Sequence, residues 1–289
     1  MQDRLTDAQR RSLERYGAAG SVDVHCHCLP GLDDGPRTTE DAVVLCRALA
    51  IDGVTTVVAT PHQLGRYDRR NSATVVNAAV AAMRDALQAA GLQLNILPGA
   101  DVRLDERILP LLAAGEVLTV GGRGGWILLE LPHETYIDPG PMIKALAARG
   151  IRSVITHPER HDTVRRRPEV VTPWLASGAV LQLTAGSLLG MFGKDAEVAA
   201  WRWLDNGQAS IVATDAHDTD RRPPCMTRAI EAIEKRCGAA VARRVCIENP
   251  ARALRPAVAP GATAAPAATG GGAVPPRRRG WGSGVPRET

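Results

Sequence analysis

The sequence predicts an α/β fold in which a parallel sheet is covered by helices. Between residue 21 and about residue 250 of the 289-residue chain, short apolar runs alternate with helical stretches. Repeated strand–helix units of this kind are typical of a parallel sheet, either closed into a barrel or doubly wound. The 45% hydrophobic content can fill a sizeable core, and because only 3% of residues are aromatic, Ala, Val and Leu must supply most of it.

Seven short apolar runs are predicted to be the strands. They cover residues 22–28, 54–60, 93–97, 126–131, 151–156, 179–184 and 210–214. Helices are predicted between them, including residues 39–52, 73–90, 141–149, 168–177 and 194–206. The first of these helices opens with threonine and acidic residues and stops at Gly53, which are signals of a helix start and a helix end.

Both ends of the chain differ in composition from the predicted domain, residues 21–255. Residues 1–20 are predicted to be an N-terminal extension that forms an amphipathic helix. Residues 256–289 are rich in Pro, Gly and Ala and nearly free of large apolar residues, so we expect a disordered tail. Its arginine run at 277–279 could touch an acidic partner or a membrane, but a solvated tail is the favoured interpretation.

The charge and the cysteines argue for an ordinary protein of the cytoplasm. The tail holds four arginines and one glutamate and so accounts for three of the four net positive charges. The rest of the chain is nearly neutral, which argues against binding to nucleic acid. The six cysteines lack the paired spacing of a disulfide scaffold and are expected to be reduced. No signal peptide or transmembrane segment is predicted, and the expected location is cytoplasmic.

The stretch DVHCHCLPGLDDGP, which begins at Asp23, contains the strongest single motif. Side chains alternate between the faces of a strand, so His25 and His27 should point the same way. Val24, Cys26 and Cys28 should then point the other way, and the cysteines are expected to be small core residues rather than ligands. Of the two carboxylates that follow, Asp33 or Asp34 could shape the turn with Gly35. We favour Asp34 as the metal ligand.

Histidines and carboxylates also follow the other predicted strands. In a parallel barrel the carboxyl ends of all strands open onto one face, so these side chains should converge. The candidate metal ligands are His25, His27, Asp34, His62, Asp101, His157, Asp215 and His217, with Asp33 and Glu130 as second-rank candidates. Imidazole and carboxylate without thiolate suit Mn, Fe or Zn, and the number of ligands implies two or three ions. His133 and His161 lie in predicted loops and are expected to be solvated.

Two arginines suggest what the ions act on. Arg160 follows His157 by three residues, and Arg222 follows His217 by five. A guanidinium presents a planar set of donors that matches the oxygens of a phosphate group. Most arginines are ordinary surface residues, but beside a metal cluster these two become candidate phosphate ligands. The ions would then stabilise the charge on the entering and leaving oxygens during attack on phosphorus.

Seven phrases of the sequence, in order and spacing, resemble one known family. They are DVHCHCLPGLDDGP, VATPHQ, LPGADVR, ILLELP, THPERH, QLTAGSLLGMFGK and TDAH. The chain resembles the PHP-superfamily bacterial tyrosine-protein phosphatases of the CpsB/YwqE type, which are encoded with capsule and exopolysaccharide genes. The resemblance covers residues 22–254, which is nearly the whole predicted domain.

The resemblance implies a distorted seven-stranded TIM-like (βα)7 barrel with a trinuclear site that usually holds Mn²⁺, with Fe or Zn as alternatives. It also implies phosphotyrosine as substrate, on a partner tyrosine autokinase that controls polysaccharide synthesis. By this resemblance the first ion is held by His25, His27, Asp101 and Asp215, the second by Asp101 and His157, and the third by Asp34, His62 and His217. Arg160 and Arg222 would bind the phosphate.

Two positions inside the matching phrases depart from the family pattern. Gln63 stands where a second histidine is usual, which would remove one imidazole beside the site. Asp101 replaces a bridging glutamate and is one methylene shorter. Two other functions stay open beside the tyrosine phosphatase. One is a small-molecule phosphomonoesterase of the histidinol-phosphate type, and the other is a metal-binding regulator with weak activity.

Overall fold

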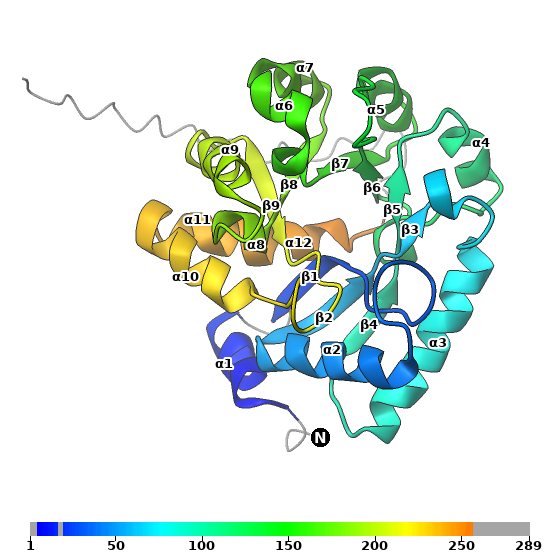
Figure 1. Cartoon of the computed structure of the whole chain (residues 1–289), viewed down its shortest axis with the longest axis vertical. Coiled ribbons are helices and arrows are strands. Elements are labelled where there is room, and N and C mark those ends of the chain that lie inside the picture. The colour runs from blue at the N-terminus through cyan, green and yellow to red at the C-terminus, as the bar shows by residue number, and fades with distance from the viewer. Residues whose placement is uncertain (1–4, 17–19, 257–289) are drawn as a thin grey trace, which may run out of the picture.

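The computed structural model describes residues 5–16 and 20–256, and these residues form nine strands (Figure 1). The strands are β1 (Ser21–Cys26), β2 (Val54–Ala59), β3 (His62–Gln63), β4 (Asn95–Pro98), β5 (Asp101–Arg103), β6 (Trp126–Glu130), β7 (Arg152–Thr156), β8 (Val180–Thr184) and β9 (Ala209–Ala213). All neighbouring strands pair in parallel. The α/β class and the seven predicted strands are therefore confirmed, and β3 and β5 are additional.

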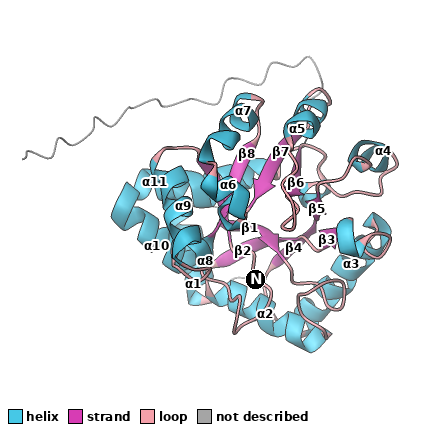
Figure 2. Cartoon of the chain, turned by 45° about the horizontal axis from the view of Figure 1, so that its top comes forward, coloured by secondary structure: helices cyan, strands magenta, loops and turns pink. Residues whose placement is uncertain are grey.

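Helices surround the strands, as Figure 2 shows in cyan against magenta. They are α1 (Asp7–Tyr16), α2 (Thr39–Ile51), α3 (Ala73–Ala89), α4 (Ile108–Ala113), α5 (Gly140–Ala147), α6 (Asp162–Arg166), α7 (Val171–Ala176), α8 (Ala185–Leu188), α9 (Lys194–Asp205), α10 (Met226–Cys237), α11 (Ala239–Arg243) and α12 (Asn249–Ala253). Short helical turns occur at Gly65–Tyr67, Val120–Gly122, Pro158–Arg160, Pro168–Val170 and Arg244–Glu248. No helix in the described part of the chain is both long enough and apolar enough to cross a membrane.

The distorted seven-stranded barrel that the resemblance implied is not confirmed, because the described strands do not form a closed sheet. The described strands form two sheets, one in the order β1-β2-β4 and the other in the order β3-β5-β6-β7-β8-β9. Two interruptions separate the sheets. Pro61, which has no N–H to donate, lies between β2 and β3. Gly99 lies between β4 and β5, where a Cβ would come within 2.5 Å of Val58 Cγ1.

Individual hydrogen bonds, rather than a regular ladder, join the first strand to the last. Beyond β9, the N–H of Asp215 donates to the His25 carbonyl at 2.8 Å, and the N–H of His27 donates to the Ala216 carbonyl at 2.9 Å. Asp23 accepts from the Thr214 backbone N–H at 3.0 Å and from the Thr214 hydroxyl. These contacts bring the ends of β1 and β9 together without closing the sheet.

An extra residue in β1 changes which side chains face inward. From Asp23 to Cys26 the strand advances three residues while β2 advances two, from Val57 to Ala59. Such a bulge exchanges the two faces of a strand. Val24 accordingly belongs to a small buried cluster that is built mostly from strand residues of both sheets, whereas Cys26 and Cys28 belong to the larger cluster beneath the helices. The cysteines are core residues as expected, but the prediction that Val24 shares their face is wrong.

The predicted N-terminal helix is present as α1, and it packs on the sheet through Gln9. The Gln9 side chain is buried and donates to the carbonyl oxygens of Val54 at 2.9 Å and Gln93 at 2.6 Å. Two carbonyls beside the starts of β2 and β4 are thereby satisfied. Residues 257–289 of the predicted tail, with its arginine run, lie outside the described residues.

Candidate metal centre

The candidate ligands converge at one end of the strands, from both sheets. They are held by β1 and the segment after it (His25, His27, Asp34), by the short strands β3 and β5 (His62, Asp101), by the last residue of β6 (Glu130), and by the segments after β7 and β9 (His157, Asp215, His217). Four groups of these residues have ligand atoms within 4.8 Å of one another. The groups are His27–Asp34–His62–His217, His25–His27–Asp101, His25–His157–Asp215 and His62–Asp101–Glu130.

Asp101 lies at the middle of the cluster. Its Oδ2 atom is 3.6 Å from His25 Nε2, 3.6 Å from His62 Nδ1 and 3.7 Å from His157 Nε2. The other oxygen, Oδ1, accepts a hydrogen bond of 3.1 Å from the Thr156 hydroxyl. The shorter carboxylate that departs from the family pattern therefore still reaches three imidazoles.

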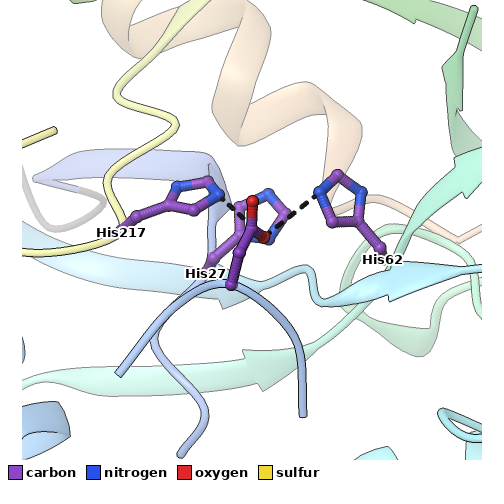
Figure 3. Close-up of side chains that lie close together, drawn as sticks. His27, His62 and His217 are labelled. Atoms are coloured by element: carbon purple, nitrogen blue, oxygen red, sulfur yellow. Dashed lines mark ion pairs between the residues drawn. The ribbon is translucent and has the colours of Figure 1, made fainter. Parts of the chain in front are cut away.

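Asp34 lies among a second set of imidazoles of the cluster. Figure 3 shows the imidazoles of His27, His62 and His217 around a carboxylate, with ion pairs to two of them. Asp34 Oδ1 lies 3.5 Å from His62 Nε2 and 3.4 Å from His217 Nε2. The His27 and His217 rings stack with their centroids 3.9 Å apart.

Asp33 performs the turn-shaping task that the sequence left open between the two carboxylates. Its Oδ1 accepts from the Gly35 N–H at 3.1 Å, and its Oδ2 accepts from His27 Nδ1–H at 2.6 Å and from the His62 backbone N–H at 3.0 Å. Burial alone would raise the pKa of Asp33, but the charge of His27 lowers it to about 2. Asp33 belongs to none of the four groups.

Hydrogen bonds fix which nitrogen of each paired histidine faces inward. His25 Nδ1–H donates to Gln182 Oε1 at 2.7 Å, and His27 Nδ1–H donates to Asp33. In the neutral rings both Nε2 atoms then carry lone pairs, yet these atoms are only 3.1 Å apart. A proton or a metal ion between them relieves that repulsion.

Several buried polar atoms in the cluster have no hydrogen-bond partner. They are Asp101 Oδ2, Asp215 Oδ1, His62 Nδ1 and His217 Nε2. An unpartnered buried polar atom is costly, and such atoms usually have a specific reason to be there. Two carboxylate oxygens and two imidazole nitrogens directed at a common space match the ligand chemistry of divalent metal ions. The residues present therefore fit a group of bound ions.

Burial and neighbouring charges shift the pKa values of the imidazoles in different directions. Burial lowers the pKa of His157 to about 4, and burial together with the charge of His27 lowers that of His217 to about 4. Burial would also lower the pKa of His27, but the carboxylates of Asp33 and Asp215 raise it to about 10. At neutral pH two of the three rings are thus already in the form that binds metal.

Two of the candidate ligands have left-handed backbone conformations. His157 has a φ of 33° and Asp215 a φ of 52°. Residues other than glycine adopt this region at a cost of order 1–3 kcal/mol, and such residues cluster at functional sites. Both side chains belong to the same candidate ligand group, together with His25.

Arg160 and Arg222 meet at one oxygen of Asp215. Arg160 Nη1 and Arg222 Nη2 both donate to Asp215 Oδ2, each at 2.5 Å. Burial alone would raise the pKa of Asp215, but Arg222, His25, His27 and Arg160 lower it well below its usual value. Arg222 Nε is buried and has no partner, so one donor remains unused.

A cavity of about 250 Å³ opens beside the cluster and the two arginines. Its lining includes Asp34, His62, Glu130, His133, His157, Arg160 and Arg222, and also Arg66, Tyr67, Arg103 and Glu134, which the sequence did not single out. Gln182 was also missed, and the only available signal was its place near the end of a predicted strand. The contact between Gln182 and His25 spans 157 residues, which no local pattern encodes.

Gln63 does not lie beside the metal cluster, so that expectation is wrong. Its side chain donates to the Asn71 carbonyl at 2.6 Å and the Glu116 carbonyl at 3.2 Å, and accepts from the Leu118 N–H at 2.9 Å. Neighbouring side chains of a strand point to opposite faces, and His62 already faces the cluster. Gln63 instead links the loops that contain Asn71 and Glu116–Leu118.

Of the two histidines that were expected to be solvated, His133 is exposed, as predicted, whereas His161 is buried, so the prediction for His161 is wrong. His161 is 3% exposed and donates from Nε2 to the Pro132 carbonyl at 2.8 Å. His133 lines the cavity and stacks on His157 with ring centroids 5.7 Å apart and an interplanar angle of 16°. Its Nε2 lies 3.5 Å from Glu130.

Two relatives of this chain are named as tyrosine-protein phosphatases. YwqE of Bacillus subtilis, a tyrosine-protein phosphatase, is 31% identical over 221 residues, which are 75% of this chain and 85% of the relative. CpsB of Streptococcus pneumoniae, also a tyrosine-protein phosphatase, is 26% identical over 236 residues, or 79% of this chain and 96% of the relative.

A solved structure is similar over most of its length. It comes from work on YwqE of Bacillus subtilis and CpsB of Streptococcus pneumoniae, described as unique metal-dependent tyrosine phosphatases. The TM-score is 0.78 at 29% identity, covering 82% of this chain and 96% of that one. The model of the family described as "Capsular polysaccharide synthesis, CpsB/CapC" matches residues 21–255. The chain therefore belongs to the CpsB/CapC family of capsular polysaccharide synthesis.

Proposed function

We propose that this chain is a metal-dependent protein-tyrosine phosphatase that hydrolyses phosphotyrosine on a bacterial tyrosine autokinase. In this role it would regulate capsular or exopolysaccharide synthesis in the cytoplasm. The observation that carries the proposal is the meeting of four candidate ligand groups and two arginines at one cavity. Membership of a family with relatives named as tyrosine-protein phosphatases supports the reaction and the substrate class.

We propose that the cluster holds three ions. His25, His27, Asp101 and Asp215 would hold the first, with Asp215 Oδ1 now 3.3 Å from His25 Nε2 and 3.4 Å from His27 Nε2. Asp34, His62 and His217 would hold the third. Asp101 and His157 would hold the second, and Glu130 joins them because it shares a ligand group with Asp101. Mn²⁺ is the proposed metal, since it accepts both imidazole and carboxylate.

The phosphate group of the substrate would be bound by Arg160 and Arg222. Both guanidiniums line the cavity, and the unpartnered Arg222 Nε offers a donor without breaking an existing contact. Guanidinium donors match phosphate oxygens, and fixed charges of this kind stabilise a transferring phosphoryl group. When bound, the ions would lower the pKa of a water molecule and neutralise charge on the phosphate.

The deciding experiment is phosphate release from a phosphotyrosine peptide by metal-stripped protein, with and without Mn²⁺. Turnover restored by Mn²⁺, and lost again in Asp34→Asn, is the expected result. Asp195→Asn, an exposed substitution in α9, is the matched control and should behave like the wild type. Absence of turnover with every divalent ion tried would contradict the proposal and favour the regulator.

Substrate choice separates the tyrosine phosphatase from the small-molecule enzyme. Histidinol phosphate and a phosphoserine peptide should be hydrolysed far more slowly than the phosphotyrosine peptide. Asp101→Glu, which restores the longer carboxylate of the family, tests how active the chain is in its present form. A large rise in rate would identify a weakened enzyme, and an unchanged rate would identify an enzyme tuned to aspartate.

A further inference from the structure

The two arginines share an aromatic contact that the proposed reaction has not used. Phe192, the only phenylalanine of the chain, lies between α8 and α9. The Arg160 Cζ atom is 4.4 Å from the centroid of its ring, and the Arg222 Cζ atom is 6.0 Å from it. Both distances are in the range of a cation–π interaction.

The segment that carries Phe192 is shaped by glycines. Gly190 and Gly193 have φ values of 78° and 87°, in the left-handed region. A Cβ atom on Gly186 would lie 3.0 Å from Phe192 Cε2, so the absence of a side chain there lets the ring pack closely. The Met191 N–H donates to the Gly186 carbonyl at 2.9 Å and holds the segment in this position. The ring is therefore held against the arginines by its own backbone.

An aromatic ring solves a specific problem at this position. Two guanidiniums that donate to the same Asp215 oxygen repel each other, so a further attractive contact stabilises the pair. A second carboxylate would occupy N–H groups that the phosphate needs. The face of a ring attracts the cations electrostatically and uses none of their donors. Arg222 Nε, which has no partner, therefore remains available to a phosphate oxygen.

We propose that Phe192 is a positioning residue that holds Arg160 and Arg222 in the geometry that binds the substrate phosphate. The inference rests on the proposed function, because it assigns a part in the same reaction. Phe192 lies outside the candidate metal ligands, so its effect should fall on phosphate affinity rather than on metal binding.

The test compares Phe192→Leu, which keeps an apolar side chain, with Phe192→Tyr, which keeps the ring. In the metal-loaded protein, Phe192→Leu should raise KM for a phosphotyrosine peptide by about fivefold to tenfold and weaken inhibition by inorganic phosphate equally. The kcat should stay within about twofold of the wild type. Phe192→Tyr should have the KM and the phosphate inhibition of the wild type. Met191→Leu, in the same segment, is the control and should also behave like the wild type.

Metal content and Tm are measured for each variant. A general packing defect would lower both quantities, whereas loss of the positioning role alone would change neither. Wild-type KM and phosphate inhibition in Phe192→Leu would overturn the inference, and so would an equal loss of affinity in Phe192→Tyr. If the metal-loaded wild type does not hydrolyse the peptide, the proposed function fails instead. Calorimetric titration with inorganic phosphate then still decides whether Phe192→Leu binds phosphate more weakly than the wild type.

Discussion

His27 is the residue whose ionisation a bound ion must change. Without an ion its pKa is raised to about 10, because Asp33 and Asp215 outweigh the effect of burial. Its Nε2 atom therefore carries a proton at neutral pH, close to the lone pair of His25 Nε2. Metal ligation requires the neutral imidazole, so the ion must displace this proton.

Metal binding at pH 8 is accordingly expected to release about one proton from His27. Because the pKa lies above the working pH, affinity should rise with pH up to about 10 and fall as the medium is acidified. Calorimetry of Mn²⁺ binding in two buffers with different ionisation enthalpies measures the release. Asp33→Asn should reduce it, and heats that do not depend on the buffer in the wild type would contradict the prediction.

Substitutions of His157 can separate its role as a metal ligand from the free-energy cost of its left-handed backbone conformation. Alanine at a φ of 33° adds strain, whereas asparagine is among the residues that tolerate this region best. His157→Asn and His157→Ala should both lower kcat at least about a hundredfold. His157→Asn should keep a Tm close to that of the wild type. Substantial turnover in either variant would remove His157 from the metal site.

At the scale of elements, Gln63 in β3 holds two loops rather than the metal site. Gln63→Ala would leave the Leu118 N–H and two carbonyl groups without their partner. The free energy of unfolding should fall by about 1–3 kcal/mol. Urea denaturation measures the loss, and Gln88→Ala, on the exposed face of α3, is the matched control. Equal stability of the two variants would contradict this role.

The sequence predicted the long elements well and the short ones poorly. The predicted helix at 73–90 is α3 (Ala73–Ala89), because Ser72 caps its start and the apolar residues keep a helical period. β3, with two residues, is too short to show any alternation. The convergence of the histidines followed from their places after strands, but the bulge in β1 has no signal in the sequence.

At the scale of the whole molecule, the candidate metal centre lies where the two sheets meet. Its candidate ligands come from β1, in the first sheet, and from β3, β5, β6 and the segments after β7 and β9, in the second. β1 and β9 are not joined by a regular hydrogen-bond ladder. Bound ions would therefore provide a further link between the two sheets. The alternation of strands and helices left a barrel and a doubly wound sheet open, because it does not show where the pairing of strands stops.

Removal of the metal should lower Tm, because ions that bind only the folded state stabilise it by about 3 kcal/mol at a hundredfold excess over Kd. Loss of protection from hydrogen exchange should be concentrated at residues 23–28 and 213–217, where β1 and β9 meet. Calorimetry and exchange mass spectrometry with and without EDTA measure both effects. A Tm that does not respond to EDTA would contradict the prediction.

The carboxylate of Asp215 has one oxygen near two histidines and the other on two arginines. A cation bound at Oδ1 would draw electron density away from Oδ2 and so weaken the hydrogen bonds between that oxygen and both guanidiniums. Metal and phosphate are then thermodynamically linked ligands with a single coupling free energy. If bound metal raises the affinity for phosphate by some factor, bound phosphate must raise the affinity for metal by the same factor. A phosphorylated substrate would thus help to retain the ions that act on it.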